Sequence, residues 1–237
     1  MCLAVRGGEL VLATGEHVDE CNFQNHSDRV GDIVLDWLTS TAFHAFGAPT
    51  TWAELLGFLT GLVTVWLVVR QHIANWPIGI ANVLLLMVAF WHVGLYGDAW
   101  LQVVYVVLGA YGWWRWRPGA TTVVRRTTRV EWGALAVAGV SLTVALWWYL
   151  DRFTSSTVPW PDAATTALSL LATYGQTRRL VESWWLWIAV DVVYVPLYGY
   201  KDLWLTAVLY LAFLALCVLG LRAWRQALDP RRETVPA

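Results

Sequence analysis

The chain has 237 residues, of which 58% are hydrophobic and only 14% are charged, and it contains 18 tryptophans. Its mean hydropathy of +0.50 is well above that of an average soluble domain. With a net charge of −1 and no basic patch interleaved with aromatic residues, the composition excludes a nucleic-acid-binding protein. Three cysteines without paired or ligand spacing exclude a disulfide framework and a zinc site. We therefore predict a polytopic, all-α membrane protein.

Residues 1–36 are polar and rich in acidic side chains, and they lack the charged start and apolar core of a signal peptide. This composition predicts a disordered N-terminal tail. An alternative is that translation starts near Val30 or Val34, because the helical pattern begins only at Asp36. The rest of the chain is expected to form a seven-helix membrane domain over 37–226 and a short cytoplasmic tail over 227–237.

From Thr51 onward, apolar runs of membrane length alternate with short polar breaks. A membrane-spanning helix needs roughly 20 predominantly apolar residues. The pattern predicts seven spans, which cover residues 51–70, 75–93, 97–116, 130–151, 162–178, 184–200 and 203–224.

The basic residues predict the orientation, because Lys and Arg are retained on the cytoplasmic side of a membrane. If the N-terminus is outside, the cytoplasmic segments hold 12 of the 16 basic residues. We therefore expect a multi-pass membrane protein with its N-terminus outside and its C-terminus in the cytoplasm. The 12 residues are Arg70, Arg115, Arg117, Arg125, Arg126, Arg129, Arg178, Arg179, Arg222, Arg225, Arg231 and Arg232.

An internal repeat relates the first three spans to the last three. A tryptophan followed six residues later by an amide or acid, and a glycine followed four residues later by a tryptophan, each occur twice at an offset of 108 or 109 residues. Three helices end on the side opposite to their start, so one linker helix is needed to make the repeats parallel. This predicts a 3+1+3 architecture with repeat one at 51–116, a linker helix at 130–151 and repeat two at 160–224. The recurring elements are Trp76 and Asn82 with Trp185 and Asp191, and Gly112 and Trp116 with Gly220 and Trp224.

Polar residues inside the apolar spans are the candidate binding residues. Asp191 follows Trp187 by one helical turn, so the two share a face. Ionisable residues inside a membrane are costly and usually functional, although a paired structural acid and, for Asn82, simple interhelical hydrogen bonding are alternatives. The repeat pairs Asn82 with Asp191 and Gln102 with Tyr210. We expect all five residues to line one central cavity between the repeats and to bind substrate.

Several segments together resemble the PnuC family of bacterial vitamin transporters over residues 36–226. They are Asn75–Asn82, Leu101–Trp116, Trp187–Asp191 and Leu205–Trp224. The resemblance implies a protein of the bacterial cytoplasmic (inner) membrane that takes up nicotinamide riboside by facilitated diffusion through alternating access. Cytoplasmic phosphorylation of the vitamin then feeds NAD biosynthesis. The family's tryptophan and amide, four residues apart, fall on Trp187 and Asp191, so an acid replaces the amide here.

The acid at position 191 bears on the substrate. Nicotinamide riboside is a pyridinium cation, and both the carboxylate of Asp191 and the indole face of Trp187 would attract it. A cation–π contact contributes about 0.5 to 2 kcal/mol. Thiamin is also a cation, so the charge argument disfavours riboflavin more than thiamin, and relatives of the family carry either. A proton-coupled carrier is a further alternative, because Asp191 could carry a proton.

Two other protein classes do not fit the residues. A retinal protein needs a lysine in the middle of its last helix, and the only lysine, Lys201, lies at the break before the last span. A membrane enzyme would need a histidine cluster, a nucleophile motif, a phosphate-binding loop or acids at metal-ligand spacing, and none occurs. We expect a transporter with no catalytic residue, cofactor or metal, whose partners are a small molecule and the lipid bilayer. Homo-oligomerisation stays open.

Overall fold

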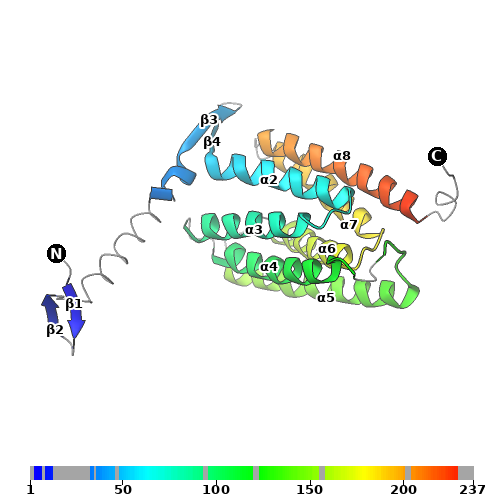
Figure 1. Ribbon diagram of the computed structural model, residues 1–237, viewed down its shortest axis with the longest axis horizontal. Coiled ribbons are helices and arrows are strands. Elements are labelled where there is room, and N and C mark those ends of the chain that lie inside the picture. Colours follow the sequence, from blue (N-terminus) through cyan, green and yellow to red (C-terminus); the bar gives the residue numbers. More distant parts are fainter. Residues whose placement is uncertain are drawn as a thin grey trace. The chain divides into compact units, whose positions relative to one another are not determined.

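The computed structural model describes residues 3–6, 9–12, 33–34, 36–45, 48–92, 96–119, 123–154, 158–200 and 204–228. The chain divides into two compact units, residues 1–55 and 56–237 (Figure 1). Most of the predicted N-terminal tail, residues 13–32, and most of the predicted C-terminal tail, residues 229–237, lie outside the described residues.

The N-terminal unit contains two short antiparallel pairs of strands that the sequence analysis does not predict. Strand β1 (Leu3–Arg6) pairs with β2 (Glu9–Leu12), and β3 (Thr41–Ala45) pairs with β4 (Ala48–Thr51). The ring of Trp37 stacks on that of Trp52 with their centroids 5.3 Å apart.

The remainder of the described chain is helical, and each predicted span coincides with one helix whose ends agree within three residues. The spans follow the helices because the polar breaks between apolar runs are also the helix ends. The helices are α2 (Trp52–Val69), α3 (Asn75–His92), α4 (Tyr96–Trp116), α5 (Arg129–Phe153), α6 (Pro159–Thr177), α7 (Ser183–Tyr200) and α8 (Trp204–Ala227).

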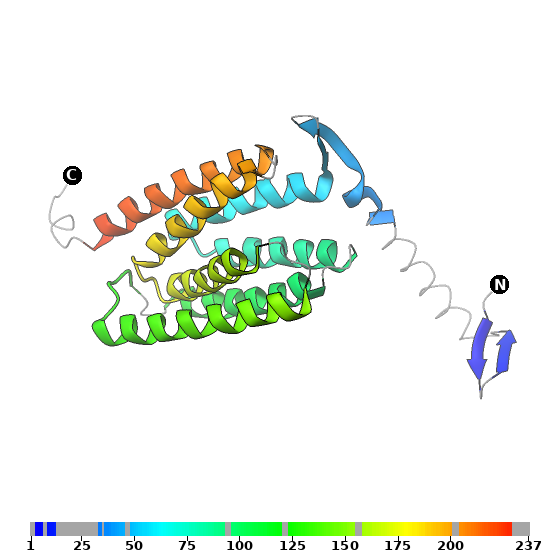
Figure 2. The same cartoon turned by 180° about the vertical axis from the view of Figure 1, so that it is seen from behind.

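The outward-facing surfaces of the helices are apolar. Val107 on α4 and Val137 on α5 are 62% and 68% exposed, which water would disfavour and lipid accommodates. By length and composition, α5 and the Thr206–Ala227 part of α8 are sufficient to cross a membrane, whereas Leu55–Val69 and Asn75–Val88 are shorter apolar segments. Helix α5 has no buried residue and packs against α6, at the edge of the bundle (Figure 2).

Four buried tryptophans, Trp76, Trp116, Trp184 and Trp224, form the centre of the core, and we call them the tryptophan cluster. Trp76 and Trp116 meet edge to face with centroids 5.3 Å apart and an interplanar angle of 87°. Trp184 and Trp224 meet in the same way, at 5.5 Å and 90°. Trp116 and Trp224 join the two pairs at 6.0 Å. Edge-to-face packing is favoured by the ring quadrupoles, so the arrangement is a stable one.

Two indoles of the tryptophan cluster also form hydrogen bonds that connect helices α2–α4 with helices α6–α8. Nε1 of Trp116 on α4 donates to the carbonyl of Thr177 at the end of α6, at 3.2 Å. Nε1 of Trp224 on α8 donates to the carbonyl of Val68 at the end of α2, at 3.1 Å. Both acceptors lie in the last turn of a helix, where carbonyls lack the usual i+4 donor, and the Val68 carbonyl also accepts from the amide of Gln71 at 2.9 Å. Each bond satisfies a buried indole N–H that would otherwise be costly to bury.

The two turns that precede α3 and α7 have matching backbones. Gln71 and Arg179, 108 positions apart, both adopt positive φ, at 54° and 52°. The amide of His72 donates to Leu67, and the amide of Leu180 donates to Gly175, each at 2.9 Å and again 108 positions apart. The sequence repeat is therefore matched by repeated local geometry at these turns.

This geometry corrects the register of the repeat. The sequence analysis equated Trp76 with Trp185, but Trp185 is 49% exposed, whereas Trp184 is fully buried in the tryptophan cluster. The offset is thus 108 residues, which places Val190 rather than Asp191 in register with Asn82. The expected pairing of Asn82 with Asp191 is wrong by one residue.

The cluster generates a stability prediction. A Cβ added at Gly112 would overlap the ring of Trp76, and one added at Gly220 would overlap Trp184. We expect Gly112→Ala and Gly220→Ala each to destabilise the protein by about 1–3 kcal/mol, as overpacking does. The matched control is Gly133→Ala on α5, where a Cβ meets nothing within 4 Å.

The measurement is thermal unfolding of the purified variants in detergent. Gly133→Ala should unfold at or slightly above the wild-type temperature, because alanine favours a helix over glycine. Equal unfolding temperatures for all three variants would contradict the tight packing of the cluster.

Candidate functional site

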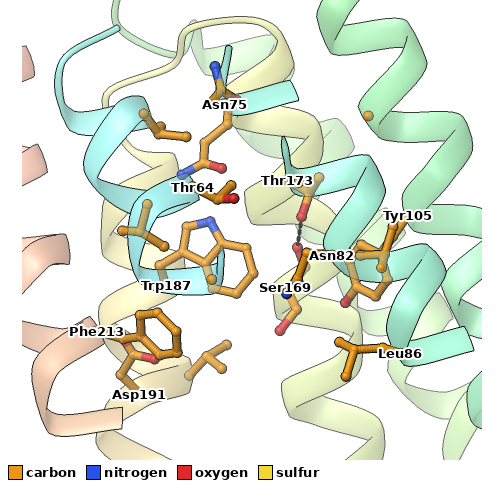
Figure 3. A pocket seen from close by; sticks show the side chains of 18 of the residues that line it. Thr64, Asn75, Asn82, Leu86, Tyr105, Ser169, Thr173, Trp187, Asp191 and Phe213 are labelled. Carbon is orange, nitrogen blue, oxygen red and sulfur yellow. Dashed lines mark hydrogen bonds between the residues drawn. The ribbon is translucent and has the colours of Figure 1, made fainter. Parts of the chain in front are cut away.

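A cavity of about 520 Å³ lies among the helices, within the usual size range of small-molecule sites. Six helices line it, and α5 contributes no residue. Among the described residues that line it there is no lysine, arginine or histidine, and Asp191 is the only carboxylate. The cavity therefore offers aromatic rings, neutral hydrogen-bonding groups and one acid to a ligand (Figure 3).

The structure brings the five predicted residues together. Asn82 on α3, Gln102 on α4, Trp187 and Asp191 on α7, and Tyr210 on α8 all line this one cavity. They come from four helices distributed along the sequence. Whether they bind substrate stays a prediction, but their placement around a single cavity is as expected.

Asp191 is 3% exposed, and its Oδ2 makes no hydrogen bond to any described residue. None of the ion pairs among the described residues includes it. The alternative of an ion-paired structural acid therefore has no partner in the described part of the chain. A lone carboxylate at such a position is costly, so Asp191 is expected to be protonated or to meet a positive charge on the cargo.

Asn82 has a structural bond as well as a place in the lining. Its Nδ2 donates to the carbonyl of Gly57 at 3.0 Å and to Oγ1 of Thr60 at 2.6 Å. Oγ1 of Thr60 in turn donates to the carbonyl of Leu56 at 2.6 Å. The amide nitrogen thus joins α3 to α2, and only the Oδ1 acceptor is left for a ligand.

An aromatic wall surrounds Tyr210. Its ring lies 4.9 Å from Tyr194 and stacks on Tyr198 at 5.1 Å, and Phe213 meets it edge to face at 5.8 Å. All four line the cavity together with Trp187. This wall provides a large surface on which a flat heteroaromatic ring can stack.

Sequence reasoning missed Tyr194 and Tyr198, and it missed the polar residues that α6 contributes. Ser169, Thr173 and Gln176 line the cavity from that helix. A signal was present, because residues spaced four and three apart lie on one face of a helix. A polar face on the predicted span 162–178 would have pointed to them.

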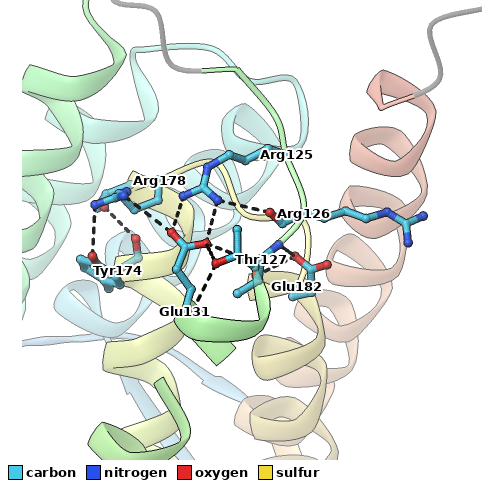
Figure 4. Close-up of polar contacts among 9 residues, drawn as sticks. Arg125, Arg126, Thr127, Glu131, Tyr174, Arg178 and Glu182 are labelled. Atoms are coloured by element: carbon cyan, nitrogen blue, oxygen red, sulfur yellow. Dashed lines mark hydrogen bonds and ion pairs between the residues drawn. The ribbon is translucent and has the colours of Figure 1, made fainter. Parts of the chain in front are cut away.

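A second polar group lies outside the cavity and fastens the loop before α5 to the turn before α7 (Figure 4). Arg125 donates to both carboxylate oxygens of Glu131, at 2.6 and 2.8 Å, and hydrogen bonding to Glu131 raises the pKa of Arg125. The amide and hydroxyl of Thr127 both donate to Glu182, at 2.9 and 2.8 Å. Backbone pairing of Arg125 with Leu180 completes the attachment. All its partners are internal, so we assign it a structural role.

Residues 51–226 match the model of a protein family described as nicotinamide mononucleotide transporter. The chain belongs to this family. The resemblance to PnuC transporters seen in the sequence is thereby confirmed, and the protein is an integral membrane transporter of the vitamin class, not an enzyme.

Relatives of the chain carry different cargoes. The riboflavin/roseoflavin transporter RibM of Streptomyces davaonensis is 34% identical over 209 residues, which cover 85% of this chain and 97% of the relative. The nicotinamide riboside transporter PnuC of Escherichia coli is 23% identical, over 76% of this chain and 87% of the relative. A crystal structure of the vitamin B3 transporter PnuC has the same fold, with a TM-score of 0.61 at 21% identity, covering 94% of this chain and 95% of that one.

The hydrogen bonds of Asn82 generate a prediction. Asn82→Asp keeps the shape but places an acceptor against the carbonyl of Gly57, so the variant should lose about 1–3 kcal/mol of stability. The matched control is Asp191→Asn, which breaks no hydrogen bond of Oδ2 within the described residues and should unfold near the wild-type temperature.

Thermal unfolding in detergent measures both variants. An Asn82→Asp protein as stable as the wild type would show that the bond to α2 contributes nothing.

Proposed function

We propose that this protein transports riboflavin, or a closely related flavin, across the membrane by facilitated diffusion. The observation that carries the proposal is the cavity itself, whose described lining residues form an aromatic wall and supply neutral hydrogen-bonding groups but include no basic side chain. Riboflavin has no phosphate group and is uncharged, so the cavity would not have to neutralise a charge on this cargo.

The same observation argues against a phosphorylated cargo, despite the description of the family. A phosphate group in a membrane interior requires arginine, lysine or a metal ion for neutralisation. In the part of the lining that the structure describes, Asp191 is the only side chain that can carry a formal charge, and a negative charge would repel phosphate. We therefore infer a dephosphorylated vitamin.

Two observations favour a flavin among the vitamins. The tricyclic ring of riboflavin is flat, uncharged and large enough to use the wide surface of Trp187, Tyr198, Tyr210 and Phe213. The match with the riboflavin/roseoflavin transporter of Streptomyces davaonensis covers 97% of that relative and 85% of this chain. With such a cargo, Asp191 would be protonated and would donate a hydrogen bond to a ring carbonyl or nitrogen.

Nicotinamide riboside, the cargo expected from the sequence, is the second candidate. The buried carboxylate of Asp191, which forms no ion pair with a described residue, favours it because this carboxylate and the indole of Trp187, one turn away, both attract a pyridinium cation. The relative from Escherichia coli supports it at lower identity. No relative named above carries thiamin, which serves as the comparison cation in the test below.

For the transport cycle, we infer two parallel repeats, α2–α4 and α6–α8, joined by α5 within a membrane domain over 37–226. The matching turns and the reciprocal bonds of Trp116 and Trp224 support this arrangement. Rocking of the repeats would expose the cavity to one side of the membrane at a time. The N-terminus would lie outside and the C-terminus in the cytoplasm.

The test is ligand binding by purified wild-type and Asp191→Asn protein, with riboflavin, nicotinamide riboside and thiamin as ligands. For riboflavin, we expect wild-type binding and a change of at most about threefold in Asp191→Asn, because the amide N–H can donate as a protonated acid does. An Asp191→Leu variant, which can neither donate nor accept, should weaken riboflavin binding by roughly tenfold, equivalent to about 1.4 kcal/mol.

The outcomes separate the two candidates. Nicotinamide riboside binding that Asp191→Asn lowers tenfold or more, without riboflavin binding, would make nicotinamide riboside the cargo. A wild-type protein that binds neither vitamin would contradict both proposals.

A further inference from the structure

Helix α6 carries a polar face that none of the predicted residues includes. Ser169, Thr173 and Gln176 follow one another at spacings of four and three, so they lie on one side of the helix, and all line the cavity. Figure 3 shows Ser169 and Thr173 on one side of the cavity and Trp187 and Asp191 on the other. The side chain of Gln176, 9% exposed, makes no hydrogen bond to any described residue.

The hydroxyl groups of Ser169 and Thr173 both donate their hydrogen to a backbone carbonyl of α6. Oγ of Ser169 donates to the carbonyl of Thr165, and Oγ1 of Thr173 donates to the carbonyl of Ser169, each at 2.8 Å. Each oxygen can therefore only accept a further hydrogen bond, and the hydroxyl of Tyr105, which also lines the cavity, lies within hydrogen-bonding reach of Ser169. A ligand group beside them must be a hydrogen-bond donor, and an aliphatic hydroxyl is the donor that vitamins with a sugar or sugar-alcohol chain supply in series.

The corresponding residues of α2 are apolar. At the 108-residue offset, Ser169, Thr173 and Gln176 match Gly61, Val65 and Val68, and these three line the cavity as well. At these three matching positions α6 presents polar side chains to the cavity and α2 presents none. Elsewhere on α2, Thr64 also lines the cavity, and its hydroxyl donates to the carbonyl of Thr60 at 2.8 Å. This difference suits a cargo with a polar end and an apolar end.

We propose that Ser169, Thr173 and Gln176 form a subsite, the α6 subsite, that accepts hydrogen bonds from the sugar or sugar-alcohol hydroxyls of the cargo. The ring of the cargo then lies toward Trp187 and the aromatic wall. This inference rests on the proposed function, since it assigns the polar end of the vitamin a place in the same cavity. It also makes the α6 subsite responsible for the preference of the protein for the complete vitamin over its ring alone.

The test compares each vitamin with its ring alone: riboflavin with lumichrome, and nicotinamide riboside with nicotinamide. The variant is Ser169→Ala combined with Thr173→Val, which removes both acceptors and keeps nearly the same volume. We expect the affinity for the complete vitamin to fall roughly tenfold while the affinity for the ring stays constant, so that the preference for the vitamin falls by the same factor. Gln176→Leu, whose amide holds no other described residue, is a second variant with the same expectation.

The matched control is Ser183→Ala. Ser183 is 2% exposed and donates to the carbonyl of Leu180 at 2.7 Å, as Ser169 donates to that of Thr165, but it does not line the cavity. Its preference for the vitamin should equal that of the wild type. Equal weakening of vitamin and ring in the α6 variants, or an unchanged preference, would overturn the α6 subsite while the proposed function stands. A wild-type protein that binds neither vitamin would overturn the proposed function, and the subsite with it.

Discussion

The helix bundle depends on two hydrogen bonds, one donated by the indole of Trp116 and one by the indole of Trp224. Each indole reaches a last-turn carbonyl of a helix in the other half of the sequence, Thr177 on α6 or Val68 on α2. Both indoles are buried, so loss of these bonds would leave each indole N–H without its acceptor. These two hydrogen bonds join α2–α4 to α6–α8 at one end of the helices. The cavity lies among the same six helices.

The chemistry of that cavity follows from what the two halves contribute. Helix α2 contributes mostly apolar residues together with Thr64, α6 contributes a polar side, and aromatic rings line much of the space. Asp191 is the only formal charge among the described lining residues. A binding site of this kind relies on stacking and on hydrogen bonds to neutral groups. Such contacts are moderate individually, which suits a carrier that must release its cargo as readily as it binds it.

The positions of the helices could be predicted from sequence because an apolar run bounded by polar residues determines both a span and its ends. The cavity lining was predictable in part for a related reason: a polar side chain such as Gln102 or Asp191 inside an apolar span has few acceptable positions other than the protein interior. The order of apolar and polar residues along the chain was therefore enough to predict the helices and part of the cavity lining.

The rest depends on packing between distant segments. Trp184 and Trp185 are chemically identical, and only the contact of Trp184 with Gly220 and Trp224 fixes the register of the repeat. The amide of Asn82 bonds to Gly57, a partner 25 residues away. Ser169 and Thr173 satisfy their hydroxyls on their own helix, as such residues do in any apolar helix, so only their shared helix face with Gln176, and no single residue, indicates that they line a cavity.

Counterflow in proteoliposomes tests the central claim most directly. Vesicles that contain the purified protein are loaded with unlabelled riboflavin, and entry of labelled riboflavin is followed with and without a protonophore. The account predicts transient accumulation of label above the level in unloaded vesicles, at a rate that collapse of the proton gradient leaves unchanged. Uptake that requires the proton gradient, or the absence of counterflow, would contradict a facilitated carrier of this vitamin.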